Sequence, residues 1–151
     1  MNKKEEFVKK HIKDALLVEM VTGFPARMLL AQAALETGWG QHIQGHNLFG
    51  IKDTSFFPGY TKMTTTEYVK DKKGRVVASF ETFPSFLHSM MYYISLIKNN
   101  PRYQYAWLMY KYKPKEYYTE LQKGGYATDP DYGEKCYNVY LSIEDGWIIE
   151  S

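Results

Sequence analysis

Cysteine is almost absent from this chain of 151 residues, in which Cys136 is the only one. A single thiol excludes an intrachain disulfide and a zinc site built on several cysteines. His42 and His46 are four residues apart, but neither has the further ligands that a zinc site needs. We therefore expect no metal site and no cofactor.

Long apolar runs are also missing. No segment approaches the roughly 20 apolar residues of a membrane-spanning helix, so we expect no integral membrane segment. The lysines near the N-terminus are not followed by the apolar stretch of a secretory signal peptide. If the target lies outside the cell membrane, we expect phage-mediated delivery, another form of export, or a chain that has been trimmed.

The chain also lacks a large excess of charge of one sign, because its formal net charge is only +2. Nucleic-acid-binding domains usually carry a strongly basic patch, and we therefore expect no nucleic-acid partner. A weak positive bias, concentrated in lysines near the N-terminus, favours approach to an anionic polymer such as a bacterial cell wall.

Tyrosine, by contrast, is abundant: the chain has 14 Tyr, against 8 Phe and 3 Trp. A tyrosine side chain combines a flat apolar ring with a hydroxyl group, which suits a groove that stacks sugar rings. A tyrosine-rich helical core would have the same composition. Composition alone favours neither interpretation.

The first part of the chain has the periodicity of two helices. Apolar residues at steps of three and four predict a helix over residues 3–22 that Gly23 ends. Pro25 suits the first turn of a second helix over residues 25–37, which Gly38 ends. The face of the first helix that we expect to be buried consists of Phe7, Val8, Ile12, Ala15, Leu16 and Met20.

A hairpin and further helices follow. Two runs rich in Thr, Tyr and Val flank a turn at residues 71–74 and predict a β-hairpin of residues 61–70 and 75–80. Helical patterns then return, and no repeat or flexible linker interrupts them. We expect these later helices at residues 84–99, 102–111, 114–122 and 130–142. The order predicts one α+β domain over residues 1–151.

Glu36 falls in the last turn of the second predicted helix. The unpaired carbonyl groups there carry partial negative charge, which disfavours a carboxylate. Apolar neighbours such as Ala33 and Phe49 add burial, and both effects raise the pKa of a carboxyl group. A glycosidase acid needs these conditions to keep its proton. The alternative is that Glu36 is an ordinary helix-end glutamate, solvated or salt-bridged. Its position alone favours this alternative over a catalytic role.

The motifs around Glu36 change this assessment. The segment LAQAALETGWG of residues 30–40, followed by NLFGIK of residues 47–52, closely resembles the signature of the glucosaminidase family, glycoside hydrolase family 73, which is related to the peptidoglycan hydrolase domain of flagellar rod assembly. Further matches follow in order as TEY (66–68), ASFETFPS (78–85), NNPRY (99–103) and GGYATDP (124–130). Several ordered matches along nearly the whole chain are more specific than a lone ETGWG.

The resemblance implies a lysozyme-like fold, mainly helical with one small β-hairpin lobe, and a substrate groove between the two lobes. It assigns Glu36 as the catalytic general acid. Glu67 on the hairpin matches a glutamate suggested as base or charge stabiliser, although a carboxylate on a solvated edge strand has the same pattern. Tyr126 matches a tyrosine that faces the catalytic site, where it would bind an acetamido group or place a water; simple packing is its alternative.

Further residues are assigned to substrate binding. We expect Asn47 and Phe49 to line the groove, and Tyr103 of the NNPRY motif to contact the substrate. Trp39 could stack on a sugar or close the core, and the core is the favoured interpretation. Asp129 is expected to cap the last long helix instead of taking part in chemistry.

The expected reaction is hydrolysis of the β-1,4 bond between N-acetylglucosamine and N-acetylmuramic acid in peptidoglycan, as in an endo-β-N-acetylglucosaminidase that acts as a monomer at the bacterial cell wall. Muramidase and lytic transglycosylase chemistry on the same fold are alternatives, and so is a wall-binding module without activity. Inverting and substrate-assisted retaining mechanisms both remain open. An autolysin, a remodeller tied to an assembly and a phage lysin are all compatible settings, the last being slightly favoured.

Overall fold

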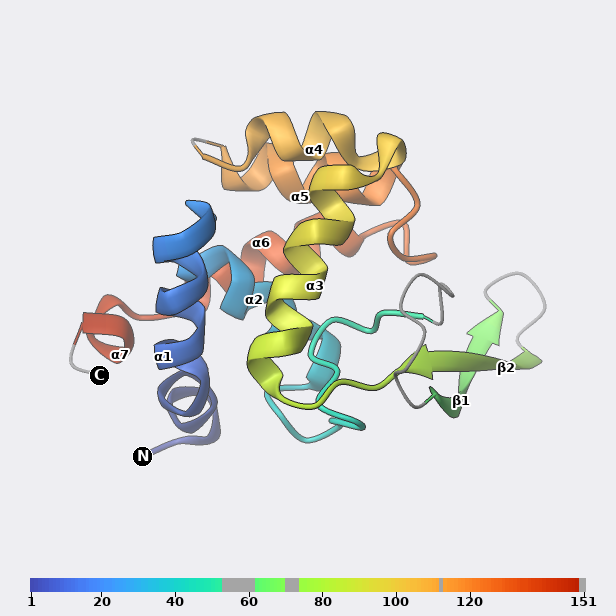
Figure 1. Ribbon diagram of the computed structural model, residues 1–151, viewed down its shortest axis with the longest axis horizontal. Coiled ribbons are helices and arrows are strands. Elements are labelled where there is room, and N and C mark those ends of the chain that lie inside the picture. Colours follow the sequence, from blue (N-terminus) through green and yellow to red (C-terminus); the bar gives the residue numbers. More distant parts are fainter. Residues whose placement is uncertain (53–61, 70–73, 112, 150–151) are drawn as a thin grey trace.

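The computed structural model describes residues 1–52, 62–69, 74–111 and 113–149, and for residues 62–69 and 74–79 the backbone only. A body of helices carries a two-stranded sheet on one side (Figure 1). In chain order the elements are α1 (Lys3–Thr22), α2 (Ala26–Thr37), β1 (Lys62–Val69), β2 (Gly74–Glu81), α3 (Phe86–Asn99), the 3₁₀ helix η1 (Pro101–Tyr103), α4 (Gln104–Met109), α5 (Pro114–Lys123), α6 (Tyr132–Ser142) and α7 (Asp145–Ile149). The predicted α+β, lysozyme-like class is confirmed.

Helix α1 has the predicted bounds, and Phe7, Val8, Ile12 and Ala15 of its predicted face are buried. The Asn2 side chain accepts a hydrogen bond from the Glu5 amide at its start, and Gly23 ends the helix. His11 and Val18 are buried, whereas Leu16 and Met20 are 40% and 80% exposed, so their predicted burial is wrong. The buried stripe continues at steps of three and four through His11, Ala15 and Val18. Leu16 and Met20 lie beside this stripe.

Helix α2 is the centre of the helical body. It packs against α1 on one side and α6 on the other, and nearly all of its residues are buried. It ends at Gly38, whose φ of 57° lies in the left-handed region where an L side chain would be strained. This C-terminal cap ends the helix at Thr37 and thus leaves Glu36 in its last turn.

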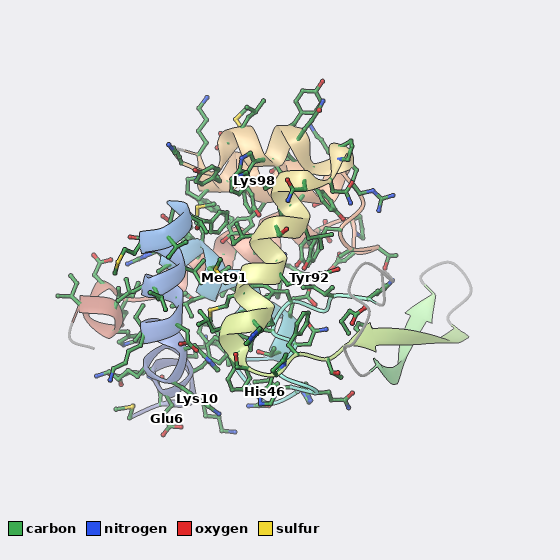
Figure 2. The ribbon with its side chains drawn as sticks, viewed as in Figure 1. Glu6, Lys10, His46, Met91, Tyr92 and Lys98 are labelled. Atoms are coloured by element: carbon green, nitrogen blue, oxygen red, sulfur yellow. The ribbon has the colours of Figure 1, made fainter. Side chains whose placement is uncertain are left out.

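Tyrosines fill much of the core. Tyr93, Tyr117 and Tyr118 are among the largest fully buried side chains in the described part of the chain. For these residues the structure supports the interpretation of the composition as a tyrosine-rich core. Helix α3 crosses the body, with Tyr92 on its hairpin side and Met91 on its α1 side (Figure 2).

The hairpin pairs β1 with β2 in antiparallel register, with Lys62 opposite Glu81 and Val69 opposite Gly74. Its base is joined to the loop after α2, because Lys52 forms a β-bridge with Phe80 and the Glu81 amide donates to the Ile51 carbonyl at 3.0 Å. Residues 71–73 of the predicted turn lie outside the described residues, and Gly74 is the first residue of β2. The sheet projects from the body on the side away from α1 and α7 (Figure 1).

The C-terminal part differs from prediction in detail. The segment predicted as one helix over residues 102–111 divides into η1 and α4, and the short α7 was not predicted. Helix α6 begins at Tyr132 instead of residue 130. None of the helices described here combines the length and the apolar character needed to cross a membrane.

Candidate active site

A cleft of about 780 Å³ opens between the C-terminal end of α2, the base of the hairpin and the start of α6. Its walls combine charged, polar and apolar groups. It is lined by Leu35, Glu36, Gln41, His42, Ile43, Gln44, Asn47, Gly50, Lys52, Phe80, Gly125, Tyr126, Ala127, Thr128, Asp129, Tyr132 and Lys135.

Glu36 lines this cleft and is half-buried at the end of α2. The hydroxyl of Tyr132 donates a hydrogen bond of 2.7 Å to its Oε1. The other carboxyl oxygen, Oε2, lies against Gly50, where a Cβ atom would collide with it. Gly50 also has a φ of 62°, so both its backbone and its space require glycine. The carboxyl group is thus held between a hydroxyl donor and a backbone turn.

Tyr126 and Tyr132 lie together beside this carboxyl group. Their rings stack with centroids 5.7 Å apart, and the Tyr126 hydroxyl donates to the Phe49 carbonyl at 2.6 Å. Burial, reinforced by the nearby Glu36 carboxylate, raises the pKa of each tyrosine well above its usual value. Both hydroxyls therefore remain protonated donors throughout the working pH range.

Glu67 occupies β1 opposite Val76 on β2. Its side chain lies outside the described residues, so the expected role as base or stabiliser stays a prediction. On the described part of the hairpin, Phe80 and the adjacent Lys52 reach the cleft. The hairpin lobe thus borders the site, as the resemblance implies.

The four residues assigned to substrate binding are placed differently from one another. Asn47 borders the cleft, but its amide is engaged in bracing the loop, donating to the Ile51 and Glu81 carbonyls and accepting from the Phe49 and Ile51 amides. Trp39 packs against Phe7 and lies under the Lys4 ammonium group, outside the cleft lining. This agrees with the favoured core interpretation.

Phe49 and Tyr103 require a correction. Phe49 is fully buried, with its ring stacked on Tyr93 at 4.4 Å, and Tyr103 is 5% exposed against Tyr126. Neither ring is open to a sugar, because each fills the core behind the cleft wall. Both residues support the site from behind.

Sequence reasoning did not single out Tyr132, whose hydroxyl donates to Glu36. It lies 96 residues further along the chain, and only the packing of α6 against α2 brings them together. Asp129 accepts from the Asp131 amide at 2.8 Å just before α6 and pairs with Lys135 at 2.5 Å on the cleft rim. The prediction that Asp129 caps this helix is therefore wrong, because Asp131 holds the N-cap position and Asp129 stabilises the turn before it.

The described part of the chain contains no group of three or more His, Cys, Asp or Glu side chains placed to hold a metal ion. His42 faces the cleft, and the His46 ring is engaged with the Phe83 carbonyl at 2.9 Å. The two histidines are therefore directed to different surroundings.

A helix-end glutamate that lines a cleft, with a small β-hairpin lobe on the opposite side, defines the lysozyme-like class of glycoside hydrolases. Within this class the chain belongs to the glucosaminidase family, whose profile, described as mannosyl-glycoprotein endo-beta-N-acetylglucosaminidase, matches residues 12–145. The resemblance inferred from the motifs is confirmed.

Individual relatives agree with this assignment. The chain is 41% identical over 148 residues to the peptidoglycan hydrolase FlgJ of Pseudomonas aeruginosa, covering 93% of this chain and 37% of that protein. It is 36% identical over 116 residues to the exo-glucosaminidase LytG of Bacillus subtilis, covering 70% of this chain and 39% of LytG. The chain thus spans less than half the length of these relatives. A crystal structure of a peptidoglycan hydrolase mutant from Sphingomonas sp. A1 superposes with a TM-score of 0.78 at 32% identity, covering 95% of both chains.

Proposed function

We propose that this chain hydrolyses the β-1,4 bond on the reducing side of N-acetylglucosamine in peptidoglycan, with Glu36 as the general acid. The observation that carries the proposal is the Glu36 carboxyl group, which lines the cleft and is held between the Tyr132 hydroxyl and Gly50. The FlgJ relative named as a peptidoglycan hydrolase supports the substrate, and the glucosaminidase family supports the bond.

The first step would transfer the Glu36 proton to the glycosidic oxygen as the bond to the sugar breaks. The leaving group departs as an alcohol, and Glu36 becomes a carboxylate. The Tyr132 hydroxyl already donates to Oε1 and would stabilise this new negative charge. Water then attacks the oxocarbenium-like centre and loses a proton.

The attack on the anomeric carbon can follow two courses. A carboxylate about 6.5–9.5 Å from Glu36 could activate the water with inversion, and Glu67 is our candidate. Alternatively, the acetamido oxygen of the substrate could displace the protonated leaving group to form a cyclic oxazolinium ion, and water then opens this ring with overall retention. Tyr126 is then the candidate for orienting the acetamido group, although its hydroxyl donates to the Phe49 carbonyl in this structure.

Mass spectrometry of digested peptidoglycan tests the proposal directly. We expect products with N-acetylglucosamine at the reducing end and no anhydro sugar. Reducing-end N-acetylmuramic acid would instead indicate a muramidase, and 1,6-anhydro products a lytic transglycosylase. Binding to insoluble wall without release of products would indicate a binding module. The Glu36→Gln variant, which keeps the shape but lacks the transferable proton, should fold normally and release no products.

We propose peptidoglycan glycan strands as the partner, the bacterial cell wall as the place of action, and a monomer as the active form. Size-exclusion chromatography with light scattering checks the last point against the mass of 17.7 kDa.

A further inference from the structure

A chain of buried hydrogen bonds leads from the core to Glu36, and the proposed reaction does not account for it. We call it the buried hydrogen-bond chain, and its members are Tyr117, Tyr93, Gln32, Tyr132 and Glu36. The Tyr117 and Tyr93 hydroxyls are 2.5 Å apart, and the Tyr93 hydroxyl donates to Gln32 Oε1. Gln32 Nε2 donates to the Tyr132 hydroxyl at 3.0 Å, and that hydroxyl donates to Glu36 Oε1 at 2.7 Å.

The amide of Gln32 gives this chain a direction. Its oxygen can only accept and its nitrogen can only donate, whereas each tyrosine has a single proton to give. Tyr93 gives its proton to Gln32, so the Tyr117 hydroxyl must donate to Tyr93. Tyr132 receives from Gln32 Nε2 and so directs its own proton to Glu36. Every proton in the buried hydrogen-bond chain therefore faces toward the carboxyl group.

The position of Gln32 makes this direction hard to reverse. Its side chain is 1% exposed and lies one helical turn before Glu36 on α2, so the two residues share a face of the helix. With the amide reversed, its oxygen would take the proton of Tyr132 away from Glu36, and its nitrogen would face the Tyr93 hydroxyl. Two bonds of the buried hydrogen-bond chain would then have to reorganise within the packed core.

We infer that Gln32 is a positioning residue that keeps the transferable proton of Glu36 on Oε2. While Tyr132 donates to Oε1, a proton on that oxygen would have no acceptor at Tyr132. The acid form therefore holds its proton on Oε2, the oxygen beside Gly50 on the cleft wall. After proton transfer the same arrangement leaves the carboxylate with its donor in place. This inference rests on the proposed role of Glu36.

A neighbouring tyrosine shows that the fold can satisfy a buried hydroxyl without such a chain. Tyr118 is as fully buried as Tyr117, but its hydroxyl donates to the Met28 carbonyl at 2.7 Å and the connection ends there. Tyr118→Phe thus removes one buried hydroxyl bond of the core while leaving the buried hydrogen-bond chain intact. It is the matched control for variants within the chain.

The test compares Gln32→Met and Tyr93→Phe with Tyr118→Phe, using soluble peptidoglycan glycan fragments and a pH–rate profile. Methionine fills the space of glutamine but neither orients Tyr132 nor accepts from Tyr93. Neutral Glu36 can then place its proton on Oε1 and donate it to Tyr132. We expect kcat to fall about 10- to 100-fold, as for misplacement of a catalytic group, with KM nearly unchanged. The alkaline limb of the profile should move to higher pH.

Tyr93→Phe leaves the Gln32 amide free to reverse, and we expect a smaller loss of kcat with the same shift of the profile. If Gln32→Met does not fold, Tyr93→Phe alone tests whether Gln32 is a positioning residue. Tyr118→Phe should lose folding stability but keep the wild-type kcat per folded molecule and the wild-type profile. The inference is overturned if the folded Gln32→Met and Tyr93→Phe proteins match Tyr118→Phe in kcat and in profile.

Glu36→Gln belongs in the same series, because it tests the proposed function separately from the role of Gln32. An active Glu36→Gln protein would overturn the proposed function together with the inference. An inactive Glu36→Gln protein beside fully active Gln32→Met and Tyr93→Phe proteins would overturn only the role of Gln32.

Discussion

Replacement of Gly50 by alanine should reduce catalysis far more than it reduces stability. The left-handed φ of 62° would cost an alanine about 1–2 kcal/mol, or roughly 2–8 °C in Tm for a domain of this size. The added Cβ would also collide with Glu36 Oε2, so the carboxyl group or the loop must move. Displacement of a catalytic group by about 1 Å can lower the rate about 100-fold.

Gly23→Ala is the matched control for this variant. Gly23 has a φ of 82°, so the backbone cost is similar, but its nearest neighbour for a Cβ is the Tyr110 hydroxyl at an ordinary 3.6 Å, away from the cleft. Thermal unfolding should show similar losses for both variants. Release of reducing ends from peptidoglycan should fall about 100-fold in Gly50→Ala and stay near wild type in Gly23→Ala. Equal activity in the two folded variants would refute the reasoning.

Three further predictions concern single side chains. Tyr132→Phe removes the donor to Glu36 and should lower kcat about 10- to 100-fold, with a loss of about 1 kcal/mol in the free energy of unfolding; a wild-type kcat would contradict it. Burial, and secondarily Lys10, lower the pKa of His11 to about 4 from 6.5. The unfolded chain therefore binds a proton that the folded chain does not, and stability should fall by roughly 2–3 kcal/mol as pH drops from 6.5 to 4. Denaturant unfolding of His11→Leu should lack this component. Glu67→Gln should lower the rate markedly if Glu67 is the base; a wild-type rate would make Glu67 structural.

Local signals predict much of this fold because they act within a few residues. The spacing of apolar residues and the glycines at 23 and 38 predict the first two helices nearly to the residue. The Thr- and Val-rich runs predict the hairpin within a residue or two at each end. The position of Glu36 in the last turn of α2 follows from the same signals, because the helix must end where Gly38 permits a left-handed turn.

Motif resemblance predicts the family, but it does not tell which matched residues face the cleft. Phe49 and Tyr103 belong to matched motifs and are nevertheless buried behind the site. A motif records that a residue type is required at a position. It does not record whether the requirement comes from substrate or from packing.

Tertiary structure alone decides the contacts between distant segments. The α1 periodicity allows more than one buried face, and only packing against α2, α3 and α7 selects His11 and Val18 over Leu16 and Met20. Glu36 is recognisable from its helix and its motif, but Tyr132 reaches it only because α6 packs on α2. The sequence by itself therefore determined most of the helices and the hairpin through short-range backbone preferences, and the candidate acid through the motif around it. The orientation of the acid and its hydrogen-bond partner depend on long-range packing, which no local pattern encodes.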